Sequence, residues 1–344
     1  EGLDPQRFRD AWQATVDAHD ILRTAFLSGG SLSQPLQVVR RDVQVPFSYE
    51  DWRGQPDQAA AIESLAAQQR NTGFALERAP LLALQLLRLD EQRYQLIYTS
   101  HHILMDGWSN AQLLAEVLQR YSGVAVADQP GRYRDYIAWL DQQDPLADER
   151  FWKAQVQHLD APTRLATVLA DSPQGQSGHA EFKQLLDTAT TQRLKVFASQ
   201  HKVTLNTLIQ AAWALLLQRY TGQSTVAFGA TVAGRSAPLP AIEAQIGLFI
   251  NTLPVVVSLA AEQSLAQVLE NLQAQNLALR DHEHTPLFDI QRWAGQGGEG
   301  LFDSLLVFEN YPVAEALQEG APQGLRFTGV QTREQTSFPL TLLV

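Results

Sequence analysis

The chain has 344 residues, with 26 Lys plus Arg against 37 Asp plus Glu, so its formal net charge is −11. Hydrophobic residues make up 45% and charged residues 18%, which is the composition of a globular protein. An acidic chain whose longest basic run is Arg40-Arg41 is a poor nucleic-acid binder, and no apolar run approaches the roughly 18 residues of a membrane helix. The lack of cysteine excludes disulfides and thiolate chemistry and suits a reducing, cytoplasmic location.

The first half of the chain mixes helices and strands. A helix is predicted from Asp4, as N-cap, with Pro5 in the first helical position. Another is predicted from Ser109, whose spacing to Gln112 fits a capping box. The expected helices cover 5–18, 59–69, 109–121, 133–140 and 148–156, and the expected strands cover 36–43, 81–89 and 94–100.

The second half has the same mixed character and follows a change in composition. Residues 161–176 are rich in proline, glycine, serine and glutamine, so we expect a linker there between lobes 1–160 and 177–344. The expected helices cover 190–200, 205–220, 265–280 and 287–293, and the expected strands cover 225–231, 249–257, 304–308, 325–328 and 340–344. The fold class is α/β of the mixed α+β kind. The chain starts at Glu1 and stops inside an expected strand, so we expect a fragment.

The stretch SHHILMDGWS, residues 100–109, is the strongest candidate site. A strand delivers His101 and His102 into a short loop before a helix, and adjacent residues of an extended chain face opposite sides. The two histidines therefore have different tasks. No G-x-S-x-G elbow and no third metal ligand accompany them, which leaves His102 as a base or hydrogen-bond partner. Taken alone, however, a His-His pair is more often structural, and Trp108 is by default a core aromatic.

Two neighbours of the histidines have backbone and charge roles to offer. Asp106 is suited to orient the loop by pairing with an arginine, or simply to cap the loop. Gly107 lets a substrate approach the backbone and presents an N–H at a helix start.

Six motifs in order along the chain resemble those of the condensation domains of nonribosomal peptide synthetases. HHILMDG is similar to their H-H-x-x-x-D-G signature. The other five are HDILRTAF (19–26), YRDYIAW (133–139), IGLFINT (246–252), HEHTPL (282–287) and LFDS with VFENY (301–311). The chain departs from the pattern at Ala18, where the family has arginine, and at Ser337, where an amide side chain is usual. The resemblance is closest to pyoverdine-type siderophore synthetase modules and to domains that take an L-configured donor.

The resemblance implies two lobes like chloramphenicol acetyltransferase, arranged as a V-shaped pseudo-dimer and here truncated at both ends. It also implies amide formation between two thioesters on phosphopantetheine arms. The partners would be upstream donor and downstream acceptor carrier domains, beside an adenylation domain. No cofactor or metal is expected within the chain itself. An acidic carrier would favour a patch such as Arg40-Arg41.

The resemblance also assigns residues. His102, Asp106 and Gly107 would act in catalysis, with Gly107 donating its N–H to an oxyanion. Asp106 would pair with Arg235 or, as second choice, Arg23. We expect His101 to pack behind the site, Trp108 and Ser109 to support it, and Asn251, Thr252 and Ser337 to line the cleft. His282 and His284 are expected at the surface or between lobes, and Tyr136 and Trp139 in a helix core.

Three alternatives remain at this stage. An ester-forming acyltransferase has the same fold and histidine, and a non-catalytic carrier-docking module belongs to another class. An epimerising relative is disfavoured because such members lack D-G-W-S.

Overall fold

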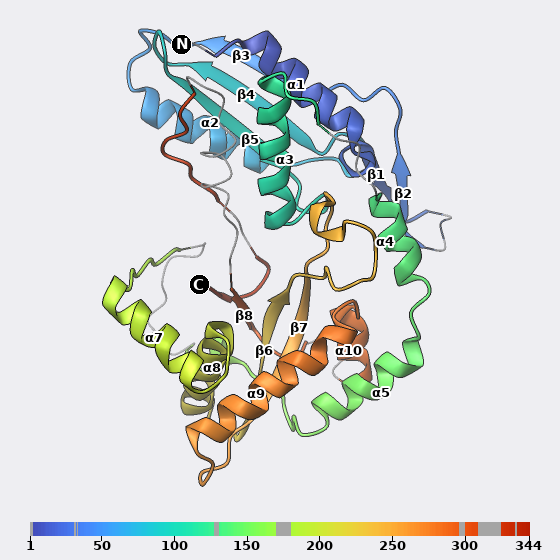
Figure 1. The fold of residues 1–344 in the computed structure, drawn as a ribbon, viewed down its shortest axis with the longest axis vertical. Coiled ribbons are helices and arrows are strands. Elements are labelled where there is room, and N and C mark those ends of the chain that lie inside the picture. Colours follow the sequence, from blue (N-terminus) through green and yellow to red (C-terminus); the bar gives the residue numbers. More distant parts are fainter. Residues whose placement is uncertain are drawn as a thin grey trace. The chain divides into compact units, whose positions relative to one another are not determined.

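The computed structural model describes residues 3–30, 32, 34–126, 131–169, 180–295, 300–308, 325–333 and 336–344 (Figure 1). The chain folds into two compact units, each built from separate stretches of sequence. Unit 1 comprises Glu1–Asp141, Ala237–Phe249 and Asn310–Arg333, and unit 2 comprises Gln142–Ser236, Ile250–Glu309 and Glu334–Val344. The chain therefore passes between the units several times.

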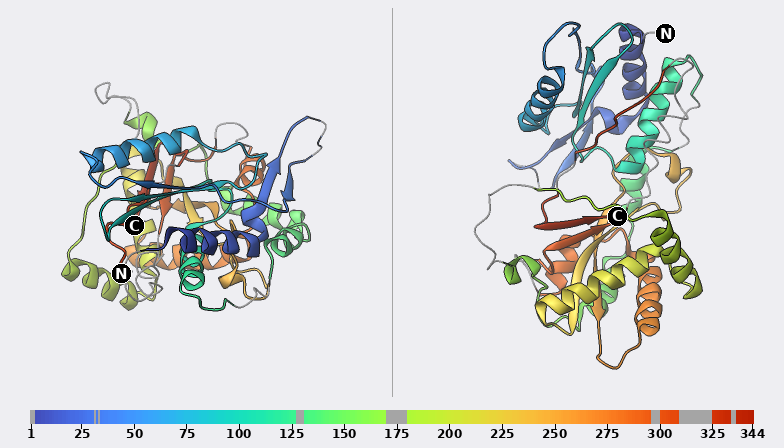
Figure 2. Two further views of the ribbon diagram at one scale, coloured as in Figure 1. Left: turned by 90° about the horizontal axis from the view of Figure 1, so that it is seen from above. Right: turned by 90° about the vertical axis from the view of Figure 1, so that its left-hand side faces the viewer.

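Unit 1 contains an antiparallel pair of strands, β1-β2, and a three-stranded sheet between helices. Its order is β3-β4-β5, with β3 parallel and β5 antiparallel to β4. Helix α2 lies on one face of this sheet, and α1 and α3 lie on the other (Figure 2). The elements of unit 1 are α1 (Pro5–Ala18), η1 (Asp20–Arg23), β1 (Thr24–Leu27), β2 (Leu36–Val39), β3 (Phe47–Asp51), α2 (Gln58–Thr72), β4 (Leu82–Arg88), β5 (Tyr94–Ser100), α3 (Gly107–Tyr121), α4 (Tyr133–Leu140) and η2 (Ile242–Ala244).

The core of unit 1 forms where α1 and α3 pack on the apolar face of the sheet. Trp12 and Leu113 are fully buried there, as are Leu82 and Leu104 on either side of the β4–β5 hairpin. Asp4 caps α1 as predicted, because its carboxylate accepts the N–H groups of both Gln6 and Arg7. By contrast, Gln69 of α2 makes polar contacts with Gln85 and Thr99 of the sheet, and α2 buries none of its own residues.

Unit 2 is a four-stranded sheet in the order β7-β6-β8-β9. β7 is antiparallel to β6, and β8 and β9 add in parallel. Among the described residues, the helices share one core with the strands through buried side chains that include Trp152, Leu165, Leu217, Leu269 and Ile290. The elements of unit 2 are α5 (Pro145–Val156), α6 (Leu165–Val168), α7 (Thr188–Gln200), α8 (Leu205–Thr221), β6 (Thr225–Val232), β7 (Asn251–Ser258), α9 (Leu265–Leu279), η3 (Arg280–His282), α10 (Leu287–Trp293), β8 (Ser304–Val307) and β9 (Leu340–Leu343).

The unit boundary differs from the one that composition predicted. Residues 142–160 belong to unit 2, and the start of the expected linker is built into it. Thr163 is fully buried, bridges to Phe302, and accepts the N–H of Ala227 with its hydroxyl. The carboxylate of Asp303 then accepts two N–H groups at the start of α6. Polar and proline-rich composition here marks hydrogen-bonded loop structure.

The strand predictions were wrong for residues 325–328 and did not include β1 or β3. Residues 325–328 form no strand, although Leu325 packs against the core of unit 1. β3 was missed because FSYED is short and largely polar.

Within the described part of the chain, no helix combines the length and the apolar character needed to cross a membrane.

Candidate functional site

The two adjacent histidines directly follow β5 and lie in different surroundings. The N–H of His101 donates to the Leu81 carbonyl (2.9 Å), and its Nδ1 accepts the N–H of Ile103 (3.0 Å). His101 is half-buried, whereas His102 is exposed. Burial, with the neighbouring His102 as a lesser cause, lowers the pKa of His101 and favours its neutral form. His101 thus serves the loop, and His102 presents its imidazole to solvent.

Asp106 is the N-cap of α3, a position that the sequence pattern wrongly assigned to Ser109. Its side chain is almost wholly buried, and Oδ1 accepts the N–H of Ser109 at 2.7 Å. Oδ2 accepts the N–H of Phe249 at 3.1 Å, and the Asp106 N–H donates to the Gly247 carbonyl at 3.2 Å. One carboxylate thereby joins the start of α3 to residues 247–249, more than a hundred positions away in sequence.

The first turn of α3 also holds residues 243–247 through its side chains. The hydroxyl of Ser109 donates to the Gly247 carbonyl (2.8 Å) and accepts the Gly247 N–H (3.1 Å). The indole N–H of Trp108 donates to the Glu243 carbonyl at 2.9 Å, and the Gln112 amide reaches the same oxygen. Trp108 is therefore an anchor with a polar contact and not simply a core aromatic.

Helix α4 supplies the third side of this arrangement. The Tyr133 hydroxyl donates to the Leu248 carbonyl (2.7 Å), and its ring lies against Gly247 so closely that an added Cβ would come within 2.1 Å of Cδ2. The Tyr136 ring packs on Phe249 with centroids 4.8 Å apart. Three segments therefore meet in unit 1, namely 100–109, 133–139 and 246–249. The loop that bears the exposed histidine is supported by the hydrogen bonds among them.

Comparison with known proteins shows the family of the chain. A family model described as the condensation domain matches residues 1–344. The chain belongs to the condensation domain family. Among curated relatives, chondramide synthase cmdD of Chondromyces crocatus is 41% identical over 348 residues, covering 99% of this chain and 9% of the relative. A linear gramicidin synthase of Brevibacillus parabrevis is 42% identical over 356 residues, covering 100% of this chain and 4% of the relative. The condensation domain thus spans under a tenth of either relative.

A solved structure of similar fold is the first condensation domain of the CDA synthetase. It superposes with a TM-score of 0.71 at 20% identity, over 90% of this chain and 75% of that one. At this identity the likeness bears on the fold alone. It confirms the mixed α/β class predicted from sequence.

The two arginines expected to pair with Asp106 have different positions. In unit 1, Arg23 pairs with Asp20 (2.8 Å) and also donates to the carbonyls of Val16 and Arg40. Its guanidinium is therefore committed elsewhere. Arg235 is buried in unit 2, so its pairing with Asp106, in unit 1, stays a prediction.

The residues expected to line the cleft belong to unit 2 and have local roles. The Asn251 amide donates to the carbonyls of Glu283 (2.9 Å) and Thr285 (2.7 Å), and its oxygen accepts the Thr252 N–H (2.9 Å). Asn251 thus fixes the junction before α10. Ser337 is exposed near the start of β9. Their lining of a cleft stays a prediction.

The HEHTPL motif contains a contact that the sequence did not reveal. Asp148 of α5 is buried, and its two oxygens meet His282 Nδ1 (2.6 Å) and His284 Nε2 (2.9 Å). The Phe151 ring stacks on His282 with centroids 4.0 Å apart. The two histidines therefore join α5 to the junction before α10. Their i,i+2 spacing was the available signal, but no pattern pointed to Asp148.

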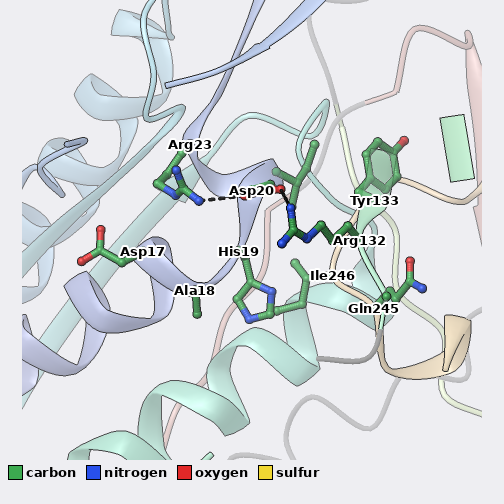
Figure 3. Close-up of a pocket in the computed structure, with 11 residues that line it drawn as sticks. Asp17, Ala18, His19, Asp20, Arg23, Arg132, Tyr133, Gln245 and Ile246 are labelled. Carbon is green, nitrogen blue, oxygen red and sulfur yellow. Dashed lines mark hydrogen bonds and ion pairs between the residues drawn. The ribbon is translucent and has the colours of Figure 1, made fainter. Parts of the chain in front are cut away.

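Unit 1 also has a polar cavity of about 400 Å³ beside η1 (Figure 3). Arg23 and Arg132 approach Asp20, at 2.8 and 3.9 Å, and Tyr133 and Gln245 lie on another side. His19 forms part of the wall, where its Nε2 lies 2.7 Å from the buried carboxylate of Glu116 on α3. Sequence reasoning did not identify this cavity, because its walls come from three distant segments.

Gly107 is the remaining residue of the predicted catalytic set. It is the first residue of α3 and is half-buried, and its N–H makes no hydrogen bond with any other described residue. A helix start with an unused N–H favours negative charge. The loop therefore carries an exposed imidazole, and the helix that follows it begins with an N–H suited to an oxyanion.

Proposed function

We propose that this condensation domain forms an amide bond between a donor acyl or peptidyl thioester and the amine of an acceptor aminoacyl thioester. Both substrates would be carried on phosphopantetheine arms, by an upstream donor carrier and a downstream acceptor carrier, next to an adenylation domain. The family match over residues 1–344 supports this reaction class. The observation that carries the proposal is an exposed His102 on a loop whose other end is fixed by the buried Asp106.

The reaction requires the protein to position the amine and the thioester and to accept one proton. An α-amine has an unperturbed pKa of about 7.7–8.0, so a neutral fraction is present near pH 7. Its nitrogen attacks the thioester carbonyl, a C–N bond forms, and the C–S bond breaks as the collapsing intermediate expels a thiolate. His102 accepts the proton that the nitrogen loses, or hydrogen-bonds to the amine as charge develops, and the leaving sulfur takes up one proton. The Gly107 N–H stabilises the oxyanion between these steps.

The decisive experiment is intact mass spectrometry of donor and acceptor carriers incubated with the domain in its synthetase. We expect the donor chain to move onto the acceptor carrier, and His102→Ala to slow this transfer by about 10²–10⁴-fold. Unchanged product formation in His102→Ala would instead favour a non-catalytic docking module. Acceptors bearing an amine or a hydroxyl separate amide from ester formation.

Three finer assignments are also proposals. An L-configured donor and a product of the pyoverdine siderophore type rest on the sequence motifs alone. A cytoplasmic location rests on the absence of cysteine in the chain. Donor carriers loaded with each enantiomer, compared in the same mass assay, test the first of these.

A further inference from the structure

We infer that Ser109 is a positioning residue for His102, and this inference rests on the proposed function. The Ser109 hydroxyl is fully buried in the first turn of α3. Serine in a helix usually bonds within its own helix or to solvent. Here the hydroxyl bonds both polar backbone groups of one distant residue, Gly247, at 2.8 and 3.1 Å.

The position of His102 depends on the bonds that hold its loop. No hydrogen bond to a described residue restrains the His102 imidazole. Its loop is fixed on one side by the bonds of His101 at the end of β5. On the other side it is fixed where α3 begins, at Asp106, whose N–H and carboxylate also bond to Gly247 and Phe249. Ser109 and Asp106 thus both hydrogen-bond to residues 247–249, and a shift of these residues moves the loop that carries His102.

Serine fits this place because its hydroxyl donates one hydrogen bond to Gly247 and accepts another from it. Alanine would leave the Gly247 N–H without the acceptor it has now, in a buried site where water cannot replace it. The Gly247 carbonyl would keep the Asp106 N–H, so the turn would remain attached, but by fewer bonds. The expected defect is therefore a loosened loop in a folded protein, and the catalytic group most affected is His102.

The test compares Ser109→Ala with Ser122→Ala on the same helix. The Ser122 hydroxyl donates to the Leu118 carbonyl (2.7 Å) at the far end of α3, so its loss removes a similar bond away from the loop. In Ser109→Ala we expect the rate of transfer between carriers to fall about 10- to 100-fold at saturating carrier, with little change in the apparent KM. Ser122→Ala should keep the wild-type rate. Ser109→Thr retains the hydroxyl and should recover part of the loss.

A second measurement does not depend on activity. The imidazole resonances of His102, assigned by their absence in His102→Ala, should shift or broaden in Ser109→Ala and stay unchanged in Ser122→Ala. A wild-type rate and unshifted His102 resonances in a folded Ser109→Ala protein would overturn the inference. So would a rate loss that only matches the loss of folded protein. If the wild-type domain transfers nothing, the proposed function fails, while the resonances still decide whether Ser109 positions His102.

Discussion

Glu116 shows at the scale of one residue how a buried charge makes stability depend on pH. Its side chain is 7% exposed, one oxygen lies 2.7 Å from His19 Nε2, and the other accepts two bonds from Arg120. Burial acts to raise the pKa of Glu116, but the hydrogen bonds and charges of His19 and Arg120 outweigh it, so the pKa is lowered. A lowered carboxyl pKa stabilises the folded state above the ordinary value of 4.5, and this contribution is lost as pH falls through the folded-state pKa.

We therefore predict that Glu116→Gln is less stable than the wild type by about 1–3 kcal/mol at pH 7. The difference should shrink steadily below pH 4.5 as the wild-type carboxyl takes up its proton. Urea unfolding of both proteins at intervals from neutral to strongly acidic pH, followed by circular dichroism, measures this gap. A gap that is constant across the range would show that the carboxylate charge contributes nothing.

At the scale of an element, α5 depends on one carboxylate near its start. Asp148 bonds to His282 and His284, whereas its neighbour Glu149 makes an exposed ion pair with Lys153 (2.6 Å). Removing a buried acceptor leaves its donors without a hydrogen-bond partner, which lowers stability, whereas an exposed ion pair contributes little to stability. We predict that Asp148→Ala destabilises unit 2 by about 2 kcal/mol or more, and Glu149→Ala by less than about 1 kcal/mol. Urea unfolding gives both values, and faster amide exchange along α5 should accompany only the first. Equal effects of the two substitutions would contradict the prediction.

The elements also show where sequence reasoning succeeds. The bounds of α1, α4 and α10 follow the predicted ranges, because caps, proline and apolar spacing are local signals. The start of α3 does not follow its prediction: its N-cap is Asp106, whose carboxylate accepts the Ser109 N–H, and the spacing of Ser109 and Gln112 placed the cap three residues too late. Residues 325–328 have the alternation of a strand, but Leu325 packs against the core of unit 1 and the segment pairs with no strand among the described residues. A contact distant in sequence decided only the second of these cases.

At the scale of the whole molecule, the motifs indicated which distant segments meet, whereas composition did not indicate how the chain divides into units. The family resemblance identified 100–109, 133–139 and 246–252 as motifs, but it did not explain why these segments meet. That reason is a set of bonds from Asp106, Ser109 and Tyr133 to residues 247–249. Composition instead suggested a single cut at 161–176, since a change in residue type carries no information about which distant segment returns to which unit.

The return of residues 237–249 to unit 1 leads to a last prediction. A fragment of residues 1–141 lacks the partners of Asp106, Ser109 and Tyr133, and it exposes the buried ring faces of Tyr133 and Tyr136 that pack on Phe249. We expect this fragment to unfold at lower temperature and less cooperatively than the same fragment joined by a flexible glycine-serine linker to residues 237–249. A scrambled 237–249 segment on the same linker is the matched control, and thermal unfolding by circular dichroism is the measurement. If the native and scrambled segments raise the midpoint equally, the segment acts by composition alone. A rise only with the native order would mean that the support of the histidine loop is assembled from two segments far apart in the sequence.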